Sequence, residues 1–250
     1  MKNNYNFGVV KLHFKFNQRT ISMPHKFKIC FPSQNLILFQ LDLCLEEGMR
    51  LIMKILYTCA MEKEAIEITK KLNMEKIEKN IYRNENETML ITGIGKQRTA
   101  INLTKYLCEN EKPEQIINIG YAGSTNIEIG KWVNITRVHN YEWDILGEEK
   151  YNMSDVGNQQ LVEIQANIPK VECYSAESFV THTDIKETVA FDMELHSIAI
   201  ICSIYKIPLI SLKKISDNLS LDKYYESIQK EEVMELVSFL HYIPKKSILV

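Results

Sequence analysis

The stretch Gln115-Ile116-Ile117-Asn118-Ile119-Gly120-Tyr121-Ala122-Gly123-Ser124 decides the fold of this chain. Its first half is a nearly unbroken apolar run of strand length, which is typical of a parallel strand buried on both faces. Its second half is rich in glycine, which is typical of a tight turn. The stretch therefore predicts a central strand over residues 115–120, followed by a loop at the strand's carboxyl end.

Strands and helices alternate on both sides of this stretch. Short apolar runs predict strands at residues 54–59, 132–135, 171–174 and 207–212, and residues 81–83 and 89–92 flank a polar turn as in a hairpin. Apolar residues at helical spacing predict helices near residues 61–72, 97–108, 193–205 and 222–240. This alternation predicts an α/β fold with a central mixed sheet. Ligands bind such sheets where the strands end, so the residues after each strand are the candidates for function.

The composition is typical of a soluble globular protein. The chain has 250 residues, of which 45% are apolar and 25% charged. Its net charge of −2 argues against a nucleic-acid partner, which demands a basic excess. The six cysteines are scattered without a Cys-x-x-Cys pair, which favours free thiols in a reducing compartment over disulfides or a zinc site. No apolar run approaches the ~20 residues of a membrane-spanning helix. We therefore expect a cytoplasmic protein without a membrane partner.

The first 52 residues differ from the rest of the chain. Basic residues such as Lys11 and Arg19 interrupt their short apolar runs, so they do not form a signal peptide. One weakly alternating run over residues 9–16 is compatible with an edge strand. Met53 leads directly into the first predicted strand, as a translation start would. We expect residues 1–52 to be an extension, either loosely attached or translated from upstream sequence, and residues 53–250 to be the functional domain.

Acidic, aromatic and glycine residues follow the predicted strands, and each has an ordinary explanation by itself. Glu64 and Glu194 stand where a carboxylate favours a helix start, and Asp217 suits a turn or helix cap. Phe179 suits an apolar core. What is informative is their order along the chain.

In that order, these motifs resemble the nucleoside phosphorylase and nucleosidase family, specifically the 5'-methylthioadenosine/S-adenosylhomocysteine nucleosidases. The matching motifs are Met53-Lys54-Ile55, Ala60-Met61-Glu62-Lys63-Glu64, Gly93-Ile94-Gly95-Lys96, Ile117-Asn118-Ile119-Gly120-Tyr121-Ala122-Gly123, Phe179, Met193-Glu194 and Ile215-Ser216-Asp217. The resemblance runs from residue 53 to about residue 240. It implies a three-layer α/β/α fold around a mixed sheet, a nucleoside substrate, a homodimer, and neither a cofactor nor a metal.

The resemblance also implies a division of labour in the hydrolysis of a purine nucleoside. Asp217 is the acid that protonates the leaving base, and Glu64 is the base that activates water. Glu194 accepts hydrogen bonds from the ribose hydroxyls, which suits the two oxygens of a carboxylate. The other implied substrate-binding residues are Met61, Ile94, Tyr121, Ala122, Gly123, Phe179, Val180, Met193, Lys213 and Ser216. Of these, Phe179 stacks on the purine, the Val180 backbone pairs with the base edge, Met193 packs under the sugar and Ile94 lines the pocket for the 5' substituent.

Two residues depart from the family pattern. Tyr121 stands where a small Ser or Thr is common, and Lys213 stands where an arginine is common, so the placement of water is expected to differ. The connection after Asp217 is also short, which predicts a reduced lid over the 5' substituent.

Three other functions remain open from the sequence. The first is phosphorolysis, but Glu64 follows the first strand where phosphorylases of the family carry a Gly-Asp-Pro-x-Arg loop, and a carboxylate repels phosphate. The second is a nucleoside-binding relative without turnover, and the third is a structural α/β domain.

Overall fold

The computed structural model describes residues 14–16, 19–21, 54–144, 161–164 and 167–229. The chain divides into two compact units, Met1–Arg50 and Leu51–Val250. In the described part of the first unit, strands β1 (Phe14–Phe16) and β2 (Arg19–Ile21) pair in antiparallel fashion. Part of the edge strand predicted over residues 9–16 is therefore a strand, and residues 9–13 lie outside the described residues.

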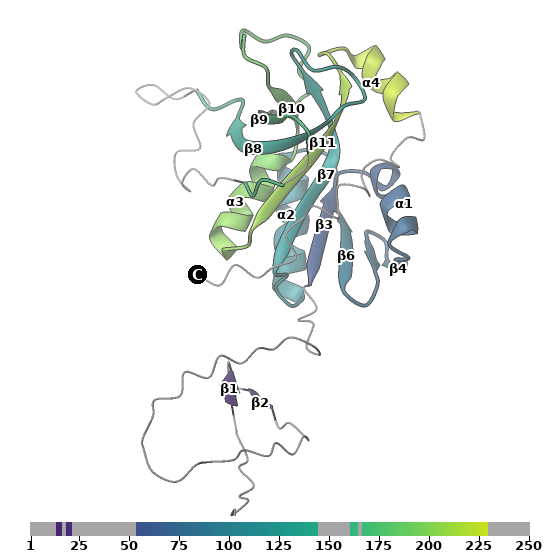
Figure 1. Ribbon diagram of the computed structural model, residues 1–250, viewed down its shortest axis with the longest axis vertical. Helices are drawn as coiled ribbons and strands as arrows, with labels where there is room; N and C mark the ends of the chain where they lie inside the picture. Colours follow the sequence, from purple (N-terminus) through teal and green to yellow (C-terminus); the bar gives the residue numbers. More distant parts are fainter. Residues whose placement is uncertain (1–13, 17–18, 22–53, 145–160, 165–166, 230–250) are drawn as a thin grey trace, which may run out of the picture. The chain divides into compact units, whose positions relative to one another are not determined.

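The described part of the second unit is built on one mixed sheet of nine strands (Figure 1). The strand order is β10-β9-β8-β11-β7-β3-β6-β5-β4. Its strands are β3 (Ile55–Cys59), β4 (Glu75–Glu78), β5 (Ile81–Arg83), β6 (Glu87–Ile91), β7 (Gln115–Ser124), β8 (Trp132–Asn140), β9 (Lys170–Ser175), β10 (Ala190–Asp192) and β11 (Leu209–Asp217). β7 lies between β3 and β11 and runs parallel to both, so the predicted central strand is confirmed.

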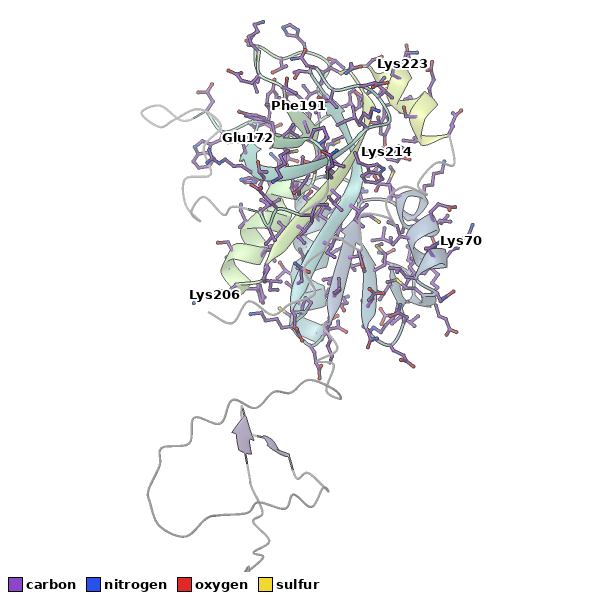
Figure 2. All side chains as sticks on the ribbon, in the orientation of Figure 1. Lys70, Glu172, Phe191, Lys206, Lys214 and Lys223 are labelled. Carbon is purple, nitrogen blue, oxygen red and sulfur yellow. The ribbon has the colours of Figure 1, made fainter. Side chains whose placement is uncertain are left out.

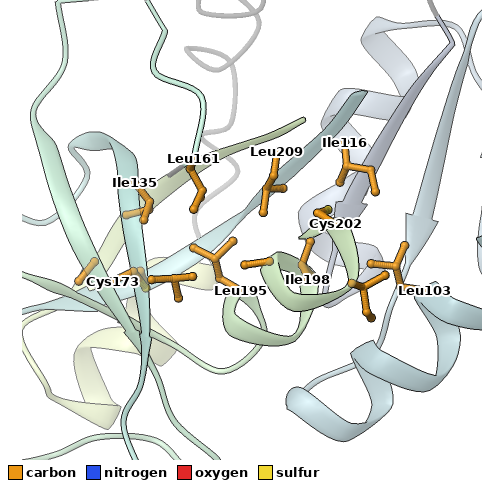
Figure 3. Packing of buried hydrophobic residues seen from close by; sticks show 14 of the residues in the cluster. Leu103, Ile116, Ile135, Leu161, Cys173, Leu195, Ile198, Cys202 and Leu209 are labelled. Carbon is orange, nitrogen blue, oxygen red and sulfur yellow. The ribbon is translucent and has the colours of Figure 1, made fainter. Parts of the chain in front are cut away.

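Helices cover the two faces of this sheet. The described helices are α1 (Glu62–Lys71), α2 (Lys96–Glu109), α3 (Leu195–Tyr205) and α4 (Leu221–Ile228). Side chains of α2 and α3 form one apolar cluster with one face of the sheet, in which Leu103, Leu195 and Ile198 pack together (Figure 3). Side chains of α1, among them Ala65 and Ile68, belong to a second cluster. The predicted α/β fold with a central mixed sheet is therefore confirmed.

The apolar run at the start of β7 explains its position. Ile116 belongs to the cluster under α2 and α3, whereas Ile117 and Ile119 belong to the cluster under α1. Successive side chains of a strand point to opposite faces, so only an unbroken apolar run serves a strand that is buried on both.

At one end the sheet is curled, and its edge strand β10 pairs with the inner strand β7. β10 pairs with β9 in parallel fashion and also with β7 in antiparallel fashion, where Phe191 lies opposite Gly123. The strands β10, β9, β8, β11 and β7 thus form a closed ring. This closure places β10 against the carboxyl end of β7, beside which the parallel strand β11 also ends.

Several predicted boundaries were wrong. β7 continues through Ser124 and β11 through Asp217, so Tyr121, Ala122, Gly123, Ser216 and Asp217 lie within strands and not in the loops after them. β8 is longer than predicted, and β4 and β10 were not predicted. The predicted helix over 222–240 is described as α4 up to Ile228, and residues 230–240 lie outside the described part. Among the described helices, none is both long and apolar enough to cross a membrane.

Candidate active site

Glu64 lies in the first turn of α1 and reaches the edge of β7. β3 pairs with β7 as far as Thr58 opposite Asn118, and beyond that point the Glu64 carboxylate accepts a hydrogen bond from the Tyr121 amide at 3.2 Å. Its other oxygen accepts from the Met61 amide at 2.9 Å, as a glutamate at the third helical position does. A β-carbon at position 120 would lie 3.1 Å from the same carboxylate, so Gly120 leaves the room that Glu64 needs. Tyr121 also lines a small cavity with Glu64 and Lys214.

Burial changes the acidity of Glu64. Desolvation raises the pKa of its carboxyl group above the ordinary value, although attraction to Lys213 and the two amide hydrogen bonds oppose this rise. A carboxylate with a raised pKa is a better proton acceptor near neutral pH.

Asp217 is the last residue of β11 and is completely buried. One carboxylate oxygen accepts from the Ser216 hydroxyl at 2.7 Å and the other from the Ser220 amide at 3.2 Å. A β-carbon at position 123 would stand 2.9 Å from Asp217 Oδ1, so the neighbouring strand must carry glycine there. Burial raises the pKa of Asp217 above its ordinary value, which favours the protonated form.

A buried ion pair lies beside Glu194. Lys213 Nζ is 2.8 Å from Asp192 Oδ2, and both side chains are almost inaccessible to water. Burial alone would raise the pKa of Asp192, but the Lys213 charge and hydrogen bonds from Ser175 and the Leu195 amide hold it below its ordinary value. The lysine that replaces the expected arginine is thus paired with a carboxylate of β10.

Glu194 precedes α3 and accepts a hydrogen bond from the Gly95 amide at 2.9 Å. Burial, together with repulsion from Asp192, raises the pKa of Glu194 to about 7. The site therefore contains carboxyl groups whose proton affinities differ because their surroundings differ.

Tyr224 of α4 lies near these groups. Burial, and then the negative charges of Glu64, Glu194 and Asp217, raise the pKa of its phenol to about 12. The charges of the three predicted carboxylates thus act on one phenol, although the carboxylates come from α1, from the segment before α3 and from β11. Figure 2 marks this end of the sheet by Lys214 on β11 and Lys223 on α4.

The remaining predicted residues lie on the same strand ends or in loops. Phe179 is half-buried, and its ring centre lies 5.6 Å from that of Tyr224. The Ser216 hydroxyl also contacts the Ala122 carbonyl oxygen at 3.2 Å, which joins β11 to β7. Met61, Val180 and Met193 are half-buried, and Ile94 is 45% exposed.

Three residues of this region were not among the predicted site residues: Lys96, Asp192 and Tyr224. Asp192 and Lys96 stand inside motifs that the sequence analysis singled out, next to Met193-Glu194 and after Gly95. The residues with which Lys96 and Asp192 form ion pairs are distant in the sequence, so only their position in a motif could have drawn attention to them. Within the described residues, no group of three or more His, Cys, Asp or Glu side chains could hold a metal ion.

Comparison with known proteins shows which families of sequence and structure the chain is similar to. A curated relative, the 5'-methylthioadenosine/S-adenosylhomocysteine nucleosidase of Glaesserella parasuis serovar 5, is 28% identical over 180 residues, covering 60% of this chain and 78% of its own. The S-adenosylhomocysteine nucleosidase of Streptococcus pyogenes, solved with 5-methylthiotubericidin, superposes with a TM-score of 0.64 at 22% identity and covers 79% of this chain and 100% of its own. A futalosine hydrolase mutant of Helicobacter pylori superposes with a TM-score of 0.62 at 17% identity, covering 76% of this chain and 99% of its own.

The two solved structures support the fold described above, including its three layers. The family profile described as the phosphorylase superfamily matches residues 54–238, which is well over half of the chain. This match confirms the family resemblance found in the sequence motifs. The chain belongs to the phosphorylase superfamily.

Proposed function

We propose that this protein hydrolyses the N-glycosidic bond of a 5'-modified adenosine, such as 5'-methylthioadenosine or S-adenosylhomocysteine, and releases adenine. The observation that carries the proposal is that the Glu64 carboxylate lies against position 120 of β7 and the Asp217 carboxylate against position 123 of the same strand. The charges of both, together with that of Glu194, raise the pKa of the Tyr224 phenol. The name of the Glaesserella parasuis relative points to the same reaction.

The two catalytic carboxyl groups have opposite tasks. Asp217, whose pKa is raised by burial, acts in its protonated form and donates its proton to N7 of the purine while the bond between N9 and the ribose C1' breaks. Glu64, ionised, accepts a proton from water, whose oxygen forms the new bond to C1'. Each group contributes roughly 10²–10⁴-fold to the rate, as is usual for general acid–base catalysis.

The ribose and the base are held by neighbouring residues. Glu194 accepts hydrogen bonds from the 2'- and 3'-hydroxyls, and Met193 packs under the sugar. Phe179 stacks on the purine, and the Val180 backbone pairs with its edge. Met61, Ile94, Tyr121, Ala122, Gly123, Lys213 and Ser216 complete the substrate site.

The geometry favours water over phosphate as the nucleophile. A phosphate ion needs a cation, but the buried Lys213 ammonium group is already paired with Asp192 at 2.8 Å. Glu64 stands at the edge of β7, where its charge would repel a second anion. Phosphorolysis is therefore the less favoured reaction.

The experiment is an assay of adenine release from 5'-methylthioadenosine, with and without phosphate. We expect release without phosphate. Asp217→Asn and Glu64→Gln should each lower kcat by roughly 10²–10⁴-fold and leave nucleoside binding by calorimetry nearly unchanged. Asp222→Asn on α4 and Glu67→Gln on α1 serve as matched controls.

Two outcomes would contradict the proposal. Release that requires phosphate would identify a phosphorylase, and tight binding without any release would identify a nucleoside-binding relative. Futalosine is a useful second substrate, because the base edge is proposed to be read by backbone groups.

The proposal extends to the assembly and to the chain's organisation. We propose a homodimer in the cytoplasm that acts in nucleoside catabolism and methionine salvage. The four described cysteines are free, which suits a reducing compartment. We also propose that residues 53–250 are the catalytic domain and residues 1–52 an extension, which the family match at 54–238 supports. Light scattering of the full chain, and adenine release by residues 53–250 alone, test these points.

A further inference from the structure

Lys96 has no part in the proposed chemistry, yet it is a buried charge beside the site. It is the first residue of α2, and only 9% of its side chain is exposed. A buried ammonium group is costly unless it is paired and hydrogen-bonded. A cation at a helix N-terminus also opposes the helix dipole. The stability of α2 therefore does not explain why a lysine stands at this position. The explanation must lie in the residues that the lysine contacts.

These partners lie on two other elements. Lys96 Nζ donates to Asn140 Oδ1 at 2.7 Å and to Glu142 Oε2 at 2.5 Å, at and just beyond the end of β8. It also lies 3.4 Å from the Ser175 carbonyl oxygen, at the end of β9, and 3.5 Å from Glu177 Oε1.

A further hydrogen bond closes this network. Glu142 uses its other carboxylate oxygen to accept from the Glu177 amide at 2.7 Å. Lys96 and Glu142 thus hold the chain at residues 175–177 from two sides. We call Lys96, Glu142 and Glu177 the loop clamp.

The clamp lies next to groups that the proposed function uses. Residue 177 is two positions before Phe179 and three before Val180, the proposed base-binding residues. On the other side, the Gly95 amide, one position before Lys96, donates to Glu194. One short segment, Gly95-Lys96, therefore contacts both the proposed ribose carboxylate and the start of the proposed base-binding loop.

We propose that Lys96 is a positioning residue that holds residues 175–180 in the conformation that binds the base. The proposal rests on the proposed function, because it assigns the base to Phe179 and Val180. The base is bound in both the ground state and the transition state, so loss of the clamp weakens both equally. Such a loss raises KM and leaves kcat nearly unchanged.

The test compares Lys96→Met with Lys105→Met, which removes an exposed lysine from the same helix. Lys96→Met should raise KM for 5'-methylthioadenosine roughly tenfold, with kcat within about threefold of the wild type. Hydrogen exchange of the amides in residues 176–180 should become faster in the same variant. Lys105→Met should change neither.

A second set of variants covers the case in which Lys96→Met fails to fold. The Glu142 and Glu177 side chains are 41% and 49% exposed, and each single variant, Glu142→Gln or Glu177→Gln, leaves the other carboxylate as a partner of the buried Lys96. Each of these two variants should also raise KM for 5'-methylthioadenosine. The effects of Lys96→Met and Glu142→Gln should not add, because they break one network.

The inference would be overturned by a KM for the clamp variants equal to that of Lys105→Met, or by a loss in kcat at unchanged KM. Faster exchange with an unaltered KM would show a purely structural clamp and would also overturn it. Failure of the proposed function is distinguishable, since the wild type would then release no adenine while the hydrogen-exchange comparison still reports on the clamp.

Discussion

At the scale of single residues, the buried pair of Lys213 and Asp192 shows how strongly one charge depends on another. Their side chains are 2% and 0% exposed, and 2.8 Å separates Nζ from Oδ2. Asp192 and Glu194 raise the pKa of Lys213 above its ordinary value although burial opposes this, so the lysine stays charged. The pair is tolerated because each charge compensates the desolvation of the other.

Removal of one partner should therefore be costly. We expect Lys213→Met to lower the free energy of unfolding by about 3–5 kcal/mol, because the Asp192 carboxylate is left buried without its cation. The double variant Lys213→Met with Asp192→Asn should recover much of that loss. Urea denaturation measures both, and a loss below about 1 kcal/mol for the single variant would contradict the argument.

At the scale of elements, α4 stands over the site through a small number of contacts. The Ser220 side chain caps its first turn, and the Ser227 hydroxyl donates to the Ser216 carbonyl oxygen at 2.5 Å. None of its residues is fully buried. The helix therefore contributes little to the core, and Tyr224 is its link to Phe179.

Tyr224→Ala should consequently affect binding more than stability. We expect KM for the nucleoside to rise roughly tenfold, since an aromatic contact and its burial are lost, while the free energy of unfolding changes by about 1 kcal/mol or less. Tyr225→Ala, at a neighbouring ring that is 52% exposed, is the control. Equal KM values for the two variants would exclude Tyr224 from the substrate site.

At the scale of the whole molecule, buried carboxyl groups make stability depend on pH. The pKa of Glu194 is about 7 in the folded protein, against an ordinary value of 4.5. A raised pKa means that the folded state binds the proton more tightly than the unfolded state does. The contribution of Glu194 to stability is therefore full below pH 4.5 and is lost as the pH rises through 7.

The contribution of His196 to stability changes with pH in the opposite direction to that of Glu194. Burial and then the nearby Lys96 charge lower its pKa to about 4, so its contribution is present above pH 6.5 and is lost as the pH falls. The test must therefore compare Glu194→Gln with the wild type, because His196 is common to both. We expect the variant to gain stability relative to the wild type between pH 5 and pH 8, measured by urea denaturation. A difference that does not vary with pH would contradict the argument.

Much of the fold follows from local patterns in the sequence. The apolar run over residues 115–120 predicts the central strand because only a doubly buried strand needs it. Strand ends were harder to predict, since Tyr121 to Ser124 and Lys213 to Asp217 are polar or glycine-rich and resemble loops. They are strands because β7 pairs with both β10 and β11 in the closed ring.

The sequence by itself determined the order of the elements, because helix starts and apolar strand runs are local properties. It drew attention to Glu64, Glu194 and Asp217 through the order of the motifs that resemble the family. Only the tertiary structure decided which groups meet. Asp192 pairs with Lys213 and Lys96 contacts Glu142. The charges of Glu64 and Glu194, both distant in the sequence, act on Tyr224 together with that of Asp217. The physical reason is that charge pairing and desolvation depend on distances in space, which are set by the packing of segments that are far apart in the sequence.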